Sequence, residues 1–212
     1  MAVTSFTRDA QHLLRDPSHL QWSIVVLLAF AFYVYAVEVE RGNWSAVLAG
    51  LAFWLMDWAN EVGNALVLHF SHRAALWTVT GSTSYLILIG LTVEISLLFL
   101  VNGVVFVKFL PARREARLLG MNNRWALALG FSLLSVGVEV LLHEAGVFHW
   151  EYWWWNVPFI PLIVIFGYLT FYVVAFTVFD MRVRSRQLQV VGGLAALDAA
   201  ALVAFGPILG WI

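Results

Sequence analysis

Four acidic side chains lie near the middle of long apolar stretches, and they constrain the fold of this chain more than any other feature. They are Asp57, Glu61, Glu94 and Glu139. No Lys or Arg lies at the same depth in those stretches to neutralise them. A charged side chain at the centre of a bilayer costs about 2.5–3.5 kcal/mol on insertion scales. We therefore expect these acids to face a protein interior and to take part in chemistry or transport.

The composition is typical of an integral membrane protein. Hydrophobic residues make up 62% of the chain and charged residues 12%, whereas a soluble domain carries about 25% charged residues. A chain of 212 residues predicts one membrane domain, 1–212, with no separate soluble domain. The net charge of −1 gives no support for a nucleic-acid partner. The absence of cysteine excludes disulfides and thiolate catalysis.

The apolar stretches predict an all-α integral membrane fold, a bundle of about six transmembrane helices. A transmembrane helix needs roughly 20 apolar residues, and a barrel would instead alternate polar and apolar residues in short strands. Glycine and proline within the stretches do not argue against helix, because membrane helices tolerate both. The predicted spans are 22–39, 45–70, 83–109, 125–148, 157–180 and 188–210.

The basic residues predict an orientation. Nine of the 12 Lys and Arg residues fall in the loops after the first, third and fifth spans. The positive-inside rule then places loops 111–124 and 182–186 in the cytoplasm and both termini outside. The tryptophans of segment 150–155 become an aromatic belt at the outer interface. The first apolar stretch has no small-residue cleavage site, so we expect a retained helix in the cell membrane.

The second span carries the richest polar pattern. Asp57, Asn60, Glu61, Asn64 and His72 share one helical face. Asparagines can simply bond helices together in membranes, which would explain Asn60 and Asn64. That explanation suits the carboxylates poorly, because like charges at i,i+4 repel each other. We interpret Asp57 and Glu61 as catalytic, and the two asparagines as candidates for substrate binding.

Other spans add to this constellation. The fourth span places Glu139 and His143 at i,i+4 on a face that also carries Ser132 and Ser135. We interpret Glu139 as catalytic, as the base or cation stabiliser, and His143 as a candidate for substrate binding. Glu94 in the third span is either a catalytic group or a hydrogen-bond partner of a neighbouring helix. By their depth along the spans, the acids are expected to form one site that opens outward or into the outer leaflet. For Asp198 in the sixth span, functional and structural roles stay equally open, whereas Asp180 is predicted to form an interfacial ion pair beside the basic loop 182–186.

Several classes of chemistry have no support in the sequence. The only lysine, Lys108, lies at a helix end, so a retinal Schiff base is not expected. There is no phosphate-binding glycine loop and no G-x-S-x-G nucleophile. A carboxyl group buried in hydrocarbon favours its neutral form, and it can then protonate an alkene or epoxide. Aromatic faces can stabilise the resulting carbocation, and the candidates for substrate binding therefore include Trp54, Trp58 and Trp150.

A short resemblance points the same way. The stretch from Glu139 through Glu144-Ala-Gly-Val-Phe-His-Trp-Glu-Tyr to Pro158 and Pro161 resembles a pattern of membrane carotenoid cyclases and hydratases. The acidic pair after Trp54 is similar in style to that of small membrane terpene cyclases. This resemblance covers about 50 residues and implies acid–base chemistry on an isoprenoid. The chain departs from the pattern at His143, His149 and its triple tryptophan.

The sequence thus predicts a membrane enzyme that transfers protons to a lipid-soluble, isoprenoid or otherwise unsaturated substrate. No cofactor is required in this interpretation, and the expected partners are membrane lipids and a hydrophobic small molecule. Two alternatives stay open. One is a proton- or cation-coupled carrier that uses the same acids. The other is a metal-dependent enzyme, whose candidate ligands are Glu61, Glu94, Glu139, His143, His69 and His72.

Overall fold

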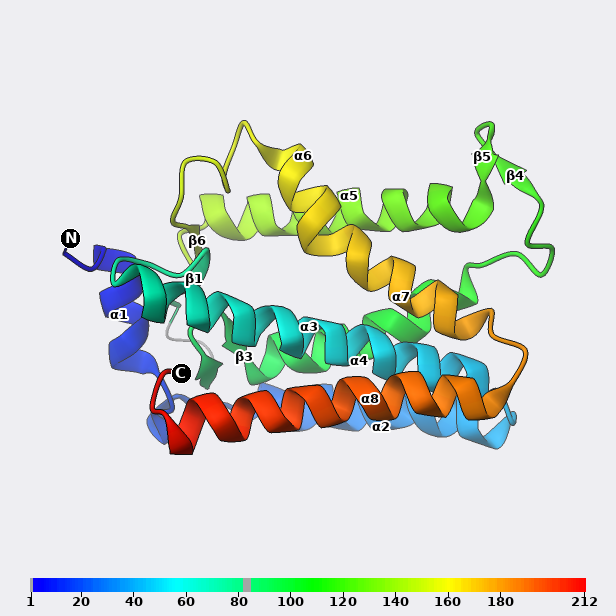
Figure 1. Cartoon of the computed structure of the whole chain (residues 1–212), viewed down its shortest axis with the longest axis horizontal. Helices are drawn as coiled ribbons and strands as arrows, with labels where there is room; N and C mark the ends of the chain where they lie inside the picture. Colours follow the sequence, from blue (N-terminus) through cyan, green and yellow to red (C-terminus); the bar gives the residue numbers. More distant parts are fainter. Residues whose placement is uncertain (1, 82–84) are drawn as a thin grey trace.

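The computed structural model describes residues 2–81 and 85–212. In this part of the chain six long helical segments run side by side (Figure 1). They are α2 (Ser23–Glu40), α3 (Trp44–Ser71), α4 (Val93–Lys108), α5 (Asn123–Glu144), the continuous segment α6 (Ile160–Leu162), η2 (Ile163–Tyr168) and α7 (Leu169–Phe179), and α8 (Arg184–Val203) extended by η3 (Ala204–Ile208). The prediction of a mostly helical membrane protein is confirmed.

Four of these segments are long and apolar enough to cross a membrane. They are Ser23–Glu40, Asn123–Glu144, Ile160–Phe179 and Arg184–Ile208. The other two differ for separate reasons. The 28 residues of α3 include the polar stripe around Asp57, and α4 has only 16 residues, or about 24 Å of helix at 1.5 Å per residue.

The third predicted span is wrong in its first part. Helix α4 begins only at Val93, and a short antiparallel pair, β2 (Leu86–Leu88) and β3 (Leu91–Thr92), precedes it. Predicted residues 83 and 84 lie outside the described part of the chain. Thr92 ends the hairpin and caps the helix, because its hydroxyl accepts a hydrogen bond from the Ile95 N–H at 3.1 Å. An apolar run this short cannot be assigned to strand or helix from its pattern alone.

Two further strand pairs depart from the predicted all-α fold. One joins β1 (Trp77–Val79) to β6 (Phe148–Trp150), and the other joins β4 (Arg117–Leu118) to β5 (Met121–Asn122). The N-terminal segment contributes helix α1 (Ser5–Leu13) and the 3₁₀ turn η1 (Pro17–His19). These elements all lie at the two ends of the bundle (Figure 1), where the backbone is no longer required to be helical.

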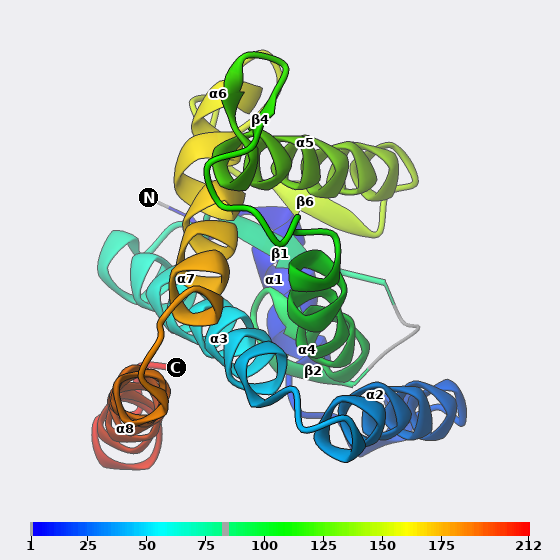
Figure 2. The same cartoon turned by 90° about the vertical axis from the view of Figure 1, so that its right-hand side faces the viewer.

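Helix α3 lies at the centre of the bundle, packed against α4, α7 and α8 (Figure 2). Helices α2 and α8 lie at the periphery of the view. The packing of α3 on α4 is close because glycines meet there. A Cβ atom on Gly103 would lie 2.6 Å from the Phe53 Cβ and 2.9 Å from the Gly50 Cα. Small residues of this kind let membrane helices approach each other.

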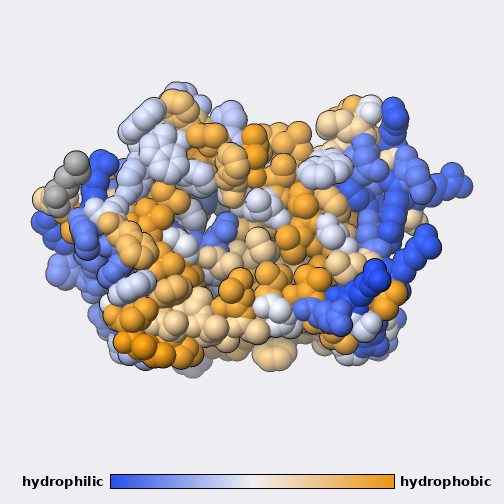
Figure 3. All heavy atoms as spheres, in the orientation of Figure 1, coloured by the Kyte–Doolittle hydropathy of each residue, from blue (hydrophilic) through white to orange (hydrophobic). Residues whose placement is uncertain are grey.

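The two ends of the bundle differ in charge. The loops after α2, α4 and α7 lie at one end, and both termini lie at the other (Figure 1). The nine basic residues of those loops therefore gather at the first end. The space-filling view shows a broad apolar middle with hydrophilic residues at both ends, most densely on the right (Figure 3). This arrangement is the one that the basic residues of the sequence predict.

An ion pair anchors α7 to α5 at the basic end. Asp180 accepts hydrogen bonds from Arg124 Nε at 3.0 Å and Nη2 at 2.9 Å, and Arg114 Nε lies 3.2 Å from the same carboxylate. The predicted ion pair at Asp180 is confirmed, but its partners come from the α4–α5 connection and α5 and not from the loop 182–186. Side chains of Arg124 and Asp180 are largely buried, so the pair is less solvated than expected.

Candidate functional site

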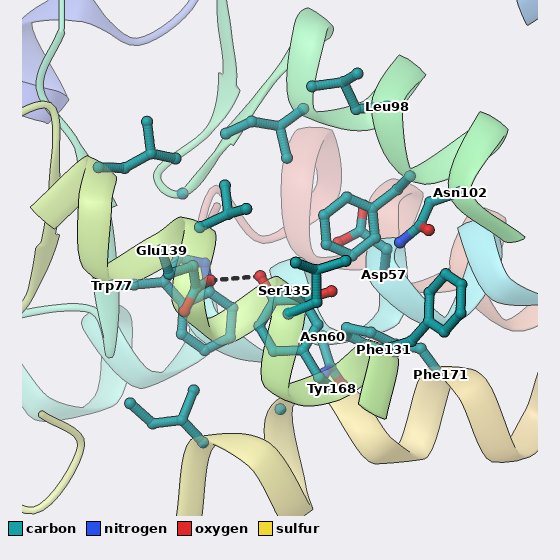
Figure 4. A pocket seen from close by; sticks show the side chains of 18 of the residues that line it. Asp57, Asn60, Trp77, Leu98, Asn102, Phe131, Ser135, Glu139, Tyr168 and Phe171 are labelled. Atoms are coloured by element: carbon teal, nitrogen blue, oxygen red, sulfur yellow. Dashed lines mark hydrogen bonds between the residues drawn. The ribbon is translucent and has the colours of Figure 1, made fainter. Parts of the chain in front are cut away.

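A cavity of about 460 Å³ lies between α3, α4, α5 and the η2–α7 segment. Its lining is mostly apolar, yet three carboxyl groups reach it: Asp57 and Glu61 from α3 and Glu139 from α5 (Figure 4). No Lys, Arg or His lines it among the described residues. The structure thus brings three of the four mid-span acids to one chamber that no basic side chain of the described residues lines.

Glu139 is paired with a tyrosine that the sequence analysis did not single out. The Tyr168 hydroxyl donates a hydrogen bond to Glu139 Oε1 at 2.7 Å (Figure 4). Tyr168 ends η2, a six-residue π-helical turn between α6 and α7. Such wide turns are frequent at functional sites. A tyrosine next to Gly167 and seven residues after Pro161 in an apolar span was the available signal, but nothing in the sequence tied it to Glu139.

Glu61 is held by the indole of Trp77, which donates a hydrogen bond from Nε1 to Oε1 at 2.9 Å. Asn64 in turn positions Trp77. Its Nδ2 donates to the Trp77 carbonyl at 2.8 Å, and its Oδ1 accepts from the N–H groups of Leu76 at 2.7 Å and Trp77 at 3.2 Å. Asn64 therefore fastens β1 to α3 and does not line the cavity. Asn64 was predicted to bind substrate, but its contacts indicate a structural role.

Asp57 makes no side-chain hydrogen bond within the described chain, and its Oδ2 is buried without a partner. Asp57 is 3% exposed and Glu61 4%. Asp198 of α8 lies close enough to Asp57 to interact with it electrostatically. The Asp198 Oδ2 is likewise buried and unpartnered. Only Gln187 and Asp198 are buried on α8, so this helix, which packs against α3, turns its acid toward the interior of the bundle.

The cavity also carries neutral polar groups. Asn60 lines it beside Asp57 (Figure 4). Toward the basic end, the Tyr172 hydroxyl accepts a hydrogen bond from Asn102 Nδ2 at 2.9 Å and lies 2.8 Å from Ser135 Oγ. This chain of three side chains spans the cavity from α4 through α7 to α5. It gives a ligand hydrogen-bonding groups away from the carboxyls.

The tryptophans predicted to bind substrate lie elsewhere. Trp54 and Trp58 both donate their indole N–H to Ser96 Oγ, at 2.8 and 3.2 Å, and so join α3 to α4. Trp150 stacks on His143 with ring centroids 5.0 Å apart. The His143 Nδ1 lies 3.1 Å from the Phe148 carbonyl oxygen. None of these four predicted side chains lines the cavity.

The remaining predicted residues are also separate from the cavity. Glu94 lies in the first turn of α4, and both of its carboxylate oxygens are buried without a hydrogen bond. His69 stacks on Trp211, with ring centroids 4.7 Å apart, and His72 is the exposed C-cap of α3. Within residues 2–81 and 85–212, no three His, Asp or Glu side chains are grouped to hold a metal ion. The structure therefore does not assemble the predicted metal-ligand set.

Comparison with known proteins shows a membrane family. A model described as an uncharacterized membrane protein family matches residues 4–207. A protein of Archaeoglobus fulgidus, described only as an uncharacterized protein, is 46% identical over 209 residues, which cover 99% of each chain. A second protein of that organism is 41% identical over 56 residues, or 26% of this chain and 100% of its own length. No solved structure matches. These descriptions name no cyclase or hydratase, so that resemblance stays a prediction.

Proposed function

Since the chain belongs to this uncharacterized membrane protein family, we propose that it is a multi-pass membrane enzyme that transfers protons to and from a lipid-soluble unsaturated substrate. In this proposal all six long helices cross the bilayer, with the basic end in the cytoplasm. One observation carries it: Asp57, Glu61 and Glu139 line one apolar cavity, and no basic side chain from residues 2–81 or 85–212 lines it. Buried ionisable groups in membrane segments mark functional sites by default.

The contacts of the three acids suggest different roles. Among the described residues none forms a hydrogen bond with the Asp57 Oδ2 atom, so Asp57 is the best placed proton donor. Glu139 accepts a hydrogen bond from Tyr168, which stabilises its carboxylate form, so it is the better proton acceptor. Glu61 accepts a hydrogen bond from Trp77. In this proposal it is neither the main proton donor nor the main proton acceptor, and its charge influences the other two acids. General acid catalysis by a positioned group contributes about 10²- to 10⁴-fold in rate.

The proposed reaction moves one proton from Asp57 to the substrate and another from the substrate to Glu139. The Asp57 O–H bond breaks as its proton adds to one carbon of a C=C bond, and the π electrons of that bond form the new C–H bond. The neighbouring carbon becomes a carbocation. Loss of a proton from an adjacent carbon to Glu139 leaves the electrons of that C–H bond to form a new C=C bond, and the net result is isomerisation. If a second C=C bond of the substrate first gives its π electrons to the carbocation, a C–C bond closes a ring, and proton loss from the new carbocation completes a cyclisation. Return of that proton from Glu139 to Asp57 restores the enzyme, with no cofactor in the cycle.

Aromatic rings support this chemistry. Phe99, Phe131, Phe171 and Tyr172 line the cavity together with Tyr168. The faces of aromatic rings attract cations, and desolvated sites give the larger effects. The apolar lining also keeps water from capturing a carbocation. An isoprenoid, with its repeated trisubstituted double bonds, is the substrate class that suits such a site best.

The test uses deuterium. Membranes that contain the protein are incubated in D₂O with a lipid extract of Archaeoglobus fulgidus, the organism of its relative, and with the lipids that co-purify with the protein. Mass spectrometry then follows deuterium fixed at carbon. We expect one lipid class to gain non-exchangeable deuterium only when the protein is present. Asp57→Asn and Glu139→Gln should each lower this incorporation by about 10²-fold or more.

Glu144→Gln is the matched control, because Glu144 lies on the same helix as Glu139 but is exposed and does not line the cavity. It should leave incorporation unchanged. Equal incorporation by the wild type, Asp57→Asn and Glu139→Gln would refute the proposed mechanism.

A proton-coupled carrier is the second candidate, and the chain Asn102–Tyr172–Ser135 favours it. These groups extend the polar lining from the acids toward the basic end, as a route across the membrane requires. A carrier should give proton uptake in proteoliposomes that depends on Asp57 and on a solute gradient, without fixing deuterium at carbon.

A further inference from the structure

The cavity has an apolar opening toward the lipid-facing side of the bundle. Helices α4 and α5 each line it, yet they barely contact one another directly. The lining residues at this gap are exposed apolar side chains. Leu98 comes from α4 (Figure 4), and Leu134, Val138 and Leu142 come from α5. Near the basic end, Phe131 of α5 makes ring contacts with Phe106 and Phe109, so the gap is bounded on that side.

The end of the cavity nearest the chain termini is covered. Strands β1 and β6 pair there, and the lining residues Phe148 and Trp155 are buried. Helix α1 packs over β1 from outside, with Phe6 stacked on His149 at 3.7 Å between ring centroids. The predicted outward opening is therefore occupied by protein.

Hydrogen bonds fasten this cover. Glu151 Oε1 accepts from the hydroxyls of Thr7 on α1, at 2.9 Å, and Thr78 on β1, at 3.3 Å. After α1, Arg15 donates from its backbone N–H to the Leu86 carbonyl at 2.9 Å and from Nε to the Ile87 carbonyl at 3.2 Å. These hydrogen bonds join α1 and the residues after it to the β1–β6 pair, the β2–β3 pair and the α5–α6 connection. We call α1, β1, β2, β3 and β6 the terminal cap.

From this geometry we infer that the cavity takes a hydrocarbon chain directly from the bilayer, through the gap between α4 and α5, and that the terminal cap keeps the aqueous phase out. The inference rests on the proposed function only in treating the cavity as a binding site. It narrows the ligand class to molecules dissolved in the membrane, because a charged or water-borne ligand would have to pass an apolar rim of leucine and valine side chains.

Photolabelling tests the route without any knowledge of the reaction. The protein is reconstituted in phosphatidylcholine vesicles that contain a long-chain hydrocarbon bearing a diazirine. After illumination, mass spectrometry maps the adducts. A parallel sample receives a charged, water-soluble diazirine. We expect the lipid probe to label buried lining residues such as Val101 and Phe171, and the water-soluble probe to leave them unlabelled.

Two tryptophan variants then locate the entrance. Leu134→Trp fills the gap, and Leu133→Trp adds the same side chain one residue away on α5, outside the cavity. The two leucines are 64% and 53% exposed. We expect Leu134→Trp to lose most deep adducts and Leu133→Trp to retain them. Adducts on Phe30 and Phe166, which are exposed away from the cavity lining, show in each sample that the protein is folded and embedded.

Leu134→Ala should have the opposite effect, because a smaller side chain widens the gap and should increase the labelling of buried lining residues. Deep adducts from the water-soluble probe, or deep adducts unchanged in Leu134→Trp, would overturn the inferred route. These outcomes are separate from the fate of the proposed reaction. Lipid entry through the gap can be observed by photolabelling even if Asp57→Asn does not lower deuterium incorporation. Equally, a loss of deuterium incorporation in Asp57→Asn can be observed even if photolabelling shows no entry through the gap.

Discussion

Single contacts distinguish the three acids of the cavity. Tyr168 and Trp77 each give one hydrogen bond to a carboxyl group, whereas no described residue gives one to Asp57. Three acids of the same type thus acquire different surroundings within one chamber. Pairs of titratable groups in contrasting environments are what separate proton donors from acceptors in enzymes. The difference follows from neighbours that are distant in sequence, 16 residues away for Glu61 and 29 for Glu139.

Gly103 gives a residue-scale prediction. A Cβ there would meet the backbone of Gly50 and the Cβ of Phe53, neither of which can move without shifting a helix. Gly103→Ala should destabilise the protein by about 1–3 kcal/mol, the usual effect of overpacking. Unfolding by SDS in mixed micelles measures the change. Gly63→Ala on α3 has open space around its Cβ and should change stability little; an equal effect of both substitutions would contradict close packing at Gly103.

At the scale of elements, the short strands matter more than their length suggests. β1 carries Trp77 to Glu61, and β6 covers the cavity through Phe148. The β2–β3 hairpin precedes α4, and in the first turn of α4 Ile95 lines the cavity whereas Glu94 does not. The terminal cap therefore supplies the hydrogen-bond partner of Glu61 and closes one end of the cavity.

His149 of β6 makes the terminal cap sensitive to pH. Burial, and next the neighbouring His143, lower the pKa of His149 from its usual 6.5, although Glu151 and Asp9 act in the opposite direction. The unfolded chain therefore binds this proton at a higher pH than the folded protein does. Stability should fall as the pH drops below about 6.5 and then level off beneath the folded-state pKa.

Thermal unfolding at pH 8 and pH 5 in detergent measures this dependence. His149→Gln, which keeps a polar group near Thr80, should weaken the loss of melting temperature at pH 5. His12→Gln on the exposed face of α1 is the control and should leave the loss as in the wild type. An unchanged pH dependence in His149→Gln would assign the effect to other groups.

The whole molecule has two unlike ends separated by an apolar middle (Figure 3). Loops after α2, α4 and α7 collect the basic residues at one end, and the terminal cap occupies the other (Figure 1). In the proposed topology an even number of membrane crossings leaves both termini on the same side. The positive-inside rule then predicts that the basic end lies in the cytoplasm.

Single cysteines test this orientation directly, because the chain contains none of its own. Arg117→Cys lies in the exposed β4 strand and Trp153→Cys in the exposed segment after β6. An impermeant thiol reagent applied to intact cells should label position 153 and spare position 117. Permeabilised cells, in which both should react, provide the control. The reverse pattern in intact cells would invert the topology.

The sequence by itself determined the class of this protein and the location of its polar groups along the helices. Hydropathy and helical periodicity are local properties, so they place Asp57, Glu61 and Glu139 in apolar segments and put the first two on one face. The charge of the loops is local too, and it predicts the unlike ends. The family match agrees that the chain is a membrane protein.

Only the tertiary structure decided which of these groups share a cavity. The periodicity of one helix carries no information on which neighbour its polar face meets, so Glu94 was grouped with the other acids although it lies outside their cavity. Trp77 and Tyr168 were missed because their hydrogen bonds to Glu61 and Glu139 form only when β1 and η2 are packed beside α3 and α5. Those contacts depend on helix order, crossing and the terminal cap, which arise from packing across the whole chain.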